Sequence, residues 1–190
     1  MKKFVLAPAL AALAMFLWGF LFWGAPHHLP YKSLGHVDDD SATALALGKL
    51  FPATGTYLVP NPTSGDEKMA ELVKRGPIAE VHITKESMDM MNPTDLTKGY
   101  LQEFVLCFIL AIMLGKAEPS FKCFSCRVKF SAAIGLLLAT CTLGDVIWWH
   151  HSLSWQLWQA FYELGSVVIA GFVLAFFFTP KATVTSPAAA

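Results

Sequence analysis

Histidine and methionine side chains suggest one kind of chemistry for this chain. Its six histidines all lie outside the long apolar segments; they are His27, His28, His36, His82, His150 and His151. Imidazole and thioether groups together suit copper, and imidazole also ligates haem iron. The candidate ligands of a copper or haem site are His82, Met88, Met91, His150 and His151, with Met90 close by. Alternatively, because no histidine pair has the spacing of a recognised metal motif, these are interfacial or packed side chains.

Three carboxylates lie within otherwise apolar segments: Glu103, Asp145 and Glu163. Charged groups inside a membrane are costly, and they mark ligand sites or proton paths. Asp145 precedes Trp149 by about one helical turn, and Glu163 follows Trp155 by about 12 Å along a helix. These groups and the neighbouring histidine pair can converge on one pocket that binds a quinol head group, passes protons or holds a metal. Alternatively, Glu103 and Asp145 lie at the wet interface, and only Glu163 needs a buried partner such as a hydroxyl.

Cys123 and Cys126 form a C-x-x-C pair, which is typical of a redox dithiol or of half a four-thiolate zinc site. Their loop is predicted to be cytoplasmic, where thiols stay reduced. Alternatively, Lys122, Arg127 and Lys129 make this loop a basic surface near anionic head groups, and the thiols are incidental. The sequence contains no nucleophile elbow, phosphate loop, zinc-protease helix or nucleotide fingerprint, so a non-enzymatic protein is favoured.

Four apolar segments must position these groups. A helix needs about 20 residues to cross the hydrocarbon of a bilayer. The segments are Phe4–Gly24, Tyr100–Gly115, Phe130–Trp149 and Trp155–Phe178. The second is short in its apolar part, but Asn92, Pro93 and Asp95 form a helix start signal, so this helix begins outside the bilayer. The sequence therefore predicts an all-α membrane fold, a four-transmembrane-helix bundle, with a small α+β domain between helices 1 and 2.

Basic residues predict the orientation of this bundle. The leader carries Lys2 and Lys3, the loop 116–129 carries four basic residues, and the tail carries Lys181, whereas the turn after Trp149 carries none. Lys and Arg favour cytoplasmic loops, so both termini are expected in the cytoplasm of a bacterial inner membrane. The first segment is long for a signal peptide and lacks small residues at a cleavage site, which favours a retained anchor over a removed signal.

Predicted domains follow from these segments: an N-terminal transmembrane helix at 1–24, a periplasmic α+β domain at 25–99, a three-helix membrane region at 100–178 and a disordered tail at 179–190. Within the periplasmic domain, a helix is expected from Ser41 to Leu50 and another from Asp66 to Arg75. Strands are expected at 55–59 and 78–84, the second with alternating apolar residues. Such a unit has a small core and is marginal alone.

Composition limits the partners. Apolar residues make up 55% of the 190 residues and charged residues 15%, which is below the roughly 25% of a typical soluble domain. The formal net charge is zero, and no dense Lys/Arg stripe of the kind that follows phosphates occurs. The expected partners are the lipid bilayer and other membrane proteins, and nucleic acid is not expected.

Scattered motifs along most of the chain carry a resemblance. They are Gly55-x-Tyr57-x-x-Pro60, Gly76-Pro77, Arg127-Val128, Trp148-Trp149, and Gly165 with Gly171 in the last segment. The arrangement resembles a family of uncharacterised bacterial four-helix inner-membrane proteins with a small periplasmic insertion after the first helix. Where that family has a turn rich in Trp, Tyr, Asn and Pro, this chain has His150-His151-Ser152-Leu153. The resemblance implies the topology and no activity.

Three functions remain open on these grounds. The first is a non-enzymatic accessory, scaffold or assembly component of a larger membrane complex, which the lack of a catalytic motif favours. The second is a periplasmic-side protein that handles copper or haem through its histidines and methionines. The third is a small membrane enzyme or transporter built around Glu163 and Asp145.

Overall fold

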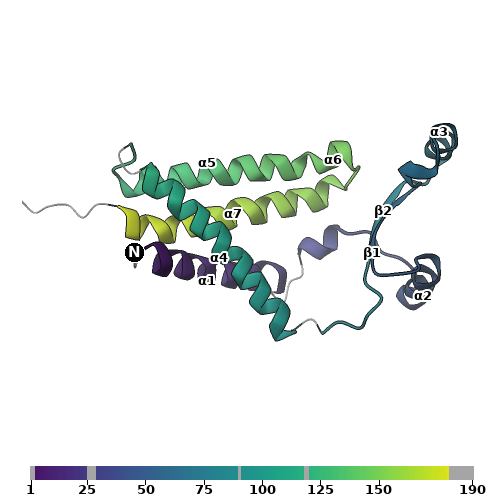
Figure 1. Cartoon of the computed structure of the whole chain (residues 1–190), viewed down its shortest axis with the longest axis horizontal. Helices are drawn as coiled ribbons and strands as arrows, with labels where there is room; N and C mark the ends of the chain where they lie inside the picture. Colours follow the sequence, from purple (N-terminus) through teal and green to yellow (C-terminus); the bar gives the residue numbers. More distant parts are fainter. Residues whose placement is uncertain (1–2, 25–28, 90, 118–119, 180–190) are drawn as a thin grey trace, which may run out of the picture. The chain divides into compact units, whose positions relative to one another are not determined.

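The computed structural model describes residues 3–24, 29–89, 91–117 and 120–179. They form two compact units (Figure 1). The first, the membrane unit, combines the described residues up to Leu34 with those from Pro93 onward. The second, the insert, is Gly35–Asn92. The predicted tail from residue 180 onward, His27, His28 and Met90 lie outside the described residues.

Four long helices build the described part of the membrane unit. They are α1 (Lys3–Gly24), α4 (Pro93–Lys116), α5 (Phe124–Leu143) with its short continuation α6 (Asp145–Trp148), and α7 (Leu153–Phe178). Each is long and apolar enough to cross a membrane. Most residues of each apolar window are not buried inside the chain, which is the pattern expected of helices that face lipid. The chain is therefore a mostly helical, multi-pass membrane protein, as the sequence predicts.

The four helices pack in a row. α7 packs along α5 on one side and along α1 on the other, and α1 packs along α4. α4 crosses α1 and α7 obliquely (Figure 1). Among the described residues, α4 and α5 make no extensive contact with each other. Because α4 and α5 do not pack together, a space remains between them, and α1 and α7 bound it on a third side.

Small residues allow α5 and α7 to approach closely. A Cβ atom on Gly171 would lie 2.2 Å from the Cβ of Ser131, and one on Gly135 would lie 3.1 Å from a methyl of Leu164. Small residues at such positions let helix backbones come together in a membrane, where dispersion and hydrogen bonds drive association. The small residues of the last segment therefore serve packing within this chain. We call this contact between α5 and α7 the seam.

Arg127 departs from its predicted place on a basic surface, because its side chain is fully buried. α5 begins at Phe124, so Arg127 lies in the first turn of the helix and is directed into the bundle. Its Nη1 donates to the carbonyl of Leu114 at 3.2 Å, in the last turn of α4. A cation there is favoured by the free carbonyls and the dipole of the α4 C-terminus. The guanidinium thus ties the end of α4 to the start of α5.

The insert contains the elements that the sequence predicts. After the 3-10 turn η1 (Pro30–Ser33) of the membrane unit come α2 (Asp40–Leu50), β1 (Gly55–Val59), the 3-10 turn η2 (Pro62–Ser64), α3 (Asp66–Arg75) and β2 (Ala79–Ile83). β1 and β2 pair antiparallel, with Gly55 opposite Ile83 and Val59 opposite Ala79. Along β2, half-buried Ala79, Val81 and Ile83 alternate with exposed Glu80 and His82, which matches the predicted period of two.

Hydrogen bonds rather than a core hold much of the insert together. Of the residues in 35–92 whose burial is described, only Pro60 is buried, so the small core expected from the sequence is thinner still. Lys85 Nζ donates to the carbonyls of Gly48 at 3.0 Å and Phe51 at 2.9 Å, which attaches the end of α2 to the end of β2. The Lys85 amide donates to Thr54 Oγ1 at 2.9 Å. Thr54 in turn donates to Glu86.

Prediction for the seam: Gly171→Ala destabilises the membrane unit. The added Cβ collides with Ser131, so the two helices must move apart, and overpacking of this kind costs typically about 1–3 kcal/mol. The free energy of unfolding in detergent, followed by SDS titration, measures the loss. Gly99→Ala in α4 is the control, because its Cβ meets the Phe16 ring at an ordinary 3.8 Å. Equal stability of both variants contradicts the close approach.

Prediction for the insert: protection of the Lys85 amide falls in acid. The hydroxyl of Thr54 is the main cause that lowers the pKa of Glu86 below its ordinary 4.5. A lowered pKa in the folded state means that this stabilisation is complete above pH 4.5 and is lost as the pH falls through the folded pKa. Amide-exchange protection factors of the full chain in micelles measure it. Glu86→Gln should remove the acid step, and an unchanged step in that variant refutes the assignment.

Candidate functional site

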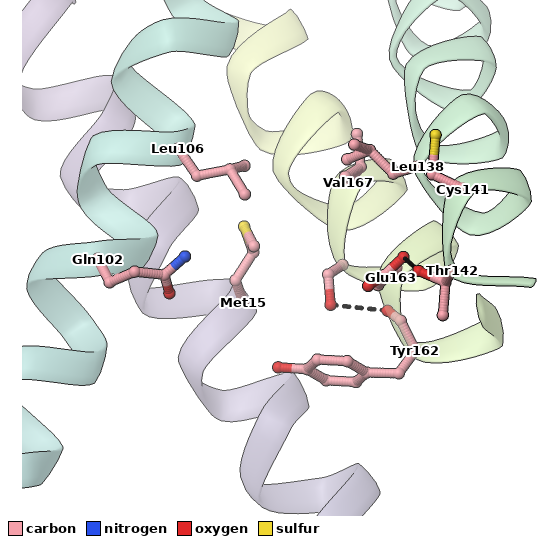
Figure 2. A pocket seen from close by; sticks show the side chains of 10 residues that line it. Met15, Gln102, Leu106, Leu138, Cys141, Thr142, Tyr162, Glu163 and Val167 are labelled. Atoms are coloured by element: carbon pink, nitrogen blue, oxygen red, sulfur yellow. Dashed lines mark hydrogen bonds between the residues drawn. The ribbon is translucent and has the colours of Figure 1, made fainter. Parts of the chain in front are cut away.

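A cavity of about 430 Å³ lies in the membrane unit where the row of helices leaves α4 and α5 apart. Its floor is formed by α1 and α7, and its walls by α4 and α5 (Figure 2). The lining residues are Met15, Gln102, Leu106, Leu138, Cys141, Thr142, Tyr162, Glu163, Ser166 and Val167. The volume falls in the range of about 300–1,000 Å³ that is typical of small-molecule sites. Polar and apolar groups therefore share one space of ligand size.

Glu163 supplies the carboxylate of this cavity. It lies about 15 Å along α7 from the first residue of that helix, at 1.5 Å per residue, which is far from either end. Thr142 of α5 donates its hydroxyl to Glu163 Oε2, as Figure 2 shows. Ser166, one turn further along α7, donates to the carbonyl of Tyr162 at 2.7 Å. The Thr142 hydroxyl satisfies one carboxylate oxygen and leaves the other to face the cavity.

The opposite wall carries Gln102 from α4. Its amide and the carboxylate of Glu163 lie on opposite sides of the cavity in Figure 2, with Met15 and Leu106 on the α1 and α4 side. An amide offers both donors and acceptors, whereas an ionised carboxylate only accepts. The cavity can therefore hydrogen-bond a molecule at two edges and contact its middle with apolar side chains.

Asp145 and His151 form a second polar cluster instead of joining Glu163. Gln156 is 3% exposed, and its Nε2 lies 2.6 Å from His151 Nδ1 and 3.4 Å from Asp145 Oδ2. The amide of His151 also donates to the carbonyl of Asp145 at 3.2 Å. None of these three residues lines the cavity. The sequence suggested one pocket for all of these groups, but the structure has two separate sites. They are separate because the third span ends in the short helix α6, which holds Asp145 at the turn before α7.

Glu103 belongs to neither cluster. It is half-buried on α4, and its Oε2 is shielded from solvent without a hydrogen-bond partner. It neighbours Gln102 in sequence but does not line the cavity.

The predicted copper or haem ligands are divided between the two units: His82, Met88 and Met91 belong to the insert, and His150 and His151 belong to the membrane unit. Among the described residues, no set of three or more His, Cys, Asp or Glu residues is placed to hold a metal ion. His82 of β2 is exposed, with Nδ1 3.0 Å from Thr56 Oγ1 and Nε2 3.5 Å from Glu80. Met88 and Met91 are exposed. A copper or haem site remains a prediction from residue type.

The turn before α7 presents His150 in an uncommon backbone conformation. Its φ is 56°, in the left-handed region that residues other than glycine seldom adopt. This conformation reverses the chain between Trp149 and the start of α7, and His150 itself is exposed.

Cys123 and Cys126 are joined by a disulfide, whereas the predicted cytoplasmic position of their loop favours reduced thiols. The C-x-x-C spacing places their Cα atoms 5.2 Å apart at the start of α5, within the range that a disulfide bridges. Cys123 is also the N-cap of α5, and its sulfur accepts from the Cys126 amide at 3.0 Å. Among the described cysteines, Cys107 and Cys141 are free, and Cys141 lines the cavity.

No protein-family model, curated protein or solved structure matches this chain. Function has to be argued from the geometry. The residues that sequence reasoning missed are Gln102, Thr142, Tyr162 and Gln156. The signal for them was present, because polar side chains inside a membrane span suggest function just as charged ones do.

Prediction for the cluster of Asp145, His151 and Gln156: Gln156→Leu loosens the turn before α7. It removes one contact to the His151 ring and one to the Asp145 carboxylate, and hydrogen bonds are worth about 0.5–1.5 kcal/mol to a neutral group and about 1.5–3 kcal/mol to a charged one. Amide exchange at Trp149 and His151 should accelerate about fivefold or more. Gln159→Leu on the same helix is the control. Unchanged exchange in Gln156→Leu, or equal acceleration in both variants, contradicts the bridging role.

Proposed function

We propose that this chain is a non-enzymatic accessory component of a larger membrane protein complex. Its membrane unit anchors it in a bacterial inner membrane with both termini in the cytoplasm. Its insert, residues 35–92, binds a partner protein on the periplasmic side. The surface of the insert is the single observation that carries this proposal.

Apolar side chains of the insert are exposed instead of packed. The exposed large ones are Val37, Leu45, Leu50, Val59, Val73, Ile78, Met88 and Met91. Leu45 is 67% exposed and Leu50 is 72% exposed, both on α2. A unit of this size already buries too little surface for a comfortable margin of stability. A unit that exposes its apolar residues and lacks a core favours association with another protein.

The basic and aromatic residues at the two ends of the membrane unit support this orientation, whereas the Cys123–Cys126 disulfide at the basic end is of a kind that is rare in the cytoplasm. Lys3 lies at the start of α1, with its Nζ 5.0 Å from the Phe178 ring centroid at the end of α7. Lys116 ends α4 at this same end, where Arg127 contacts Leu114. Trp148 and Trp149 lie at the other end and are exposed. Basic residues favour the cytoplasmic side, and tryptophans favour the membrane interface.

Aromatic rings pack together where α1 ends, η1 lies and α7 begins. The ring of Trp23, near the end of α1, lies 5.6 Å from Trp155 and 5.3 Å from Tyr162 on α7. Tyr31 in η1 lies 6.3 Å from Trp155. Aromatic pairs at these separations contribute about 0.5–1.5 kcal/mol each beyond area burial. An aromatic cluster therefore joins η1 to the neighbouring ends of α1 and α7.

Prediction for the insert surface: a photo-crosslinking residue at Leu45 or Leu50 in living cells yields one dominant protein adduct. The pair Leu45→Gln with Leu50→Gln should lower recovery of the complex about tenfold or more, because exposed apolar anchors carry much of the binding energy. The pair Ala46→Gln with Lys49→Gln on the same helix is the control. A chain that purifies alone and yields no adduct from either position contradicts the accessory role.

A further inference from the structure

We infer that the cavity between α4 and α5 is a binding site for a lipid-soluble hydroxylated ring of the hydroquinone class, held by Glu163 and Gln102. This inference is independent of partner binding by the insert. It rests on the access, the size and the polarity of the cavity.

Access to the cavity is lateral. In the described part of the bundle, α4 and α5 are not packed against each other, so the space between them opens toward the surroundings of the helices. For a membrane-spanning bundle these surroundings are lipid. Leu138, on the α5 wall, is 39% exposed. A ligand dissolved in the bilayer can therefore enter without passing through water.

The polarity of the cavity favours a hydroxyl donor. Glu163 lies deep in the apolar span, where an unsatisfied carboxylate is costly. Thr142 donates to one of its oxygens. A ligand hydroxyl that donates to the other oxygen gives both oxygens of the Glu163 carboxylate a hydrogen bond. Moving a water molecule into the lipid hydrocarbon costs free energy, so a hydroxyl attached to an apolar molecule is the better partner.

The far wall favours a second polar group on the same ligand. Gln102 lies on α4 across the cavity from Glu163 (Figure 2). Leu106, Leu138 and Val167 supply apolar contact between these two ends. A ring with hydroxyls at opposite positions places a donor at Glu163 and a donor or acceptor at Gln102. A lipophilic cation would use the carboxylate but would leave the Gln102 amide without a partner.

Binding of a short-chain para-hydroquinone to the full chain in nanodiscs tests the inference. Fluorescence of the tryptophans or equilibrium dialysis should show saturable binding. The dimethyl ether of the same hydroquinone lacks both donors and should bind about tenfold more weakly or worse, since it cannot donate a hydrogen bond to the carboxylate. Non-saturable uptake of the hydroquinone, or equal binding of both probes, overturns the proposal.

Two substitutions on one helix locate the site. Leu138→Trp fills the cavity and should abolish saturable binding, whereas Leu136→Trp, at a residue 60% exposed that does not line the cavity, should leave it unchanged. Glu163→Gln keeps a partner for Thr142 and should weaken binding about tenfold. Unfolding in detergent checks that each variant is folded. Where a variant is unstable, photolabelling of the unsubstituted chain with an azido-hydroquinone decides: adducts on cavity residues support the site, and adducts elsewhere overturn it.

Discussion

The close approach of α5 and α7 is the constraint on which the rest of the membrane unit depends. At Gly171 the absence of a side chain lets Ser131 pack against the helix backbone, so this close approach requires the register that pairs the two residues. That register brings Thr142 to Glu163 in the span and Gln156 to Asp145 at the turn. Because lipid supplies no water to replace a missing partner, a slip of the register would leave these groups unsatisfied at a cost of several kcal/mol.

The cavity is a consequence of how the remaining helices join the seam. α1 packs on α7, and α4 packs on α1, so the row does not close between α4 and α5. A closed bundle would have buried Glu163 against apolar side chains. The seam gives Glu163 a polar neighbour on α5, and the open row places Gln102 across the cavity from it. Arg127 limits how far α4 and α5 separate, because it joins them where α4 ends.

Local patterns predicted much of the fold. The four spans follow from apolar length, the start of α4 follows from Pro93 and Asp95, and β2 follows from its alternation. Pairings between elements were not predictable in this way. In the sequence, Arg127 is a basic residue of a loop, but in the structure it lies in the first turn of α5 and is directed into the bundle. The role of Gln156 depends on the seam, which places it beside Asp145. These contacts depend on helix register and rotation, which periodicity within a single segment does not determine.

The seam couples α5 to α7 through Thr142 and Glu163, and a double-mutant cycle in detergent measures this coupling directly. The free energies of unfolding of Thr142→Val, Glu163→Leu and the double variant are compared with that of the unsubstituted chain. We expect a coupling energy of about 1.5–3 kcal/mol, as for a hydrogen bond to a charged group. Effects that add within about 0.5 kcal/mol would mean that the two residues do not interact, and would contradict the register on which the cavity rests.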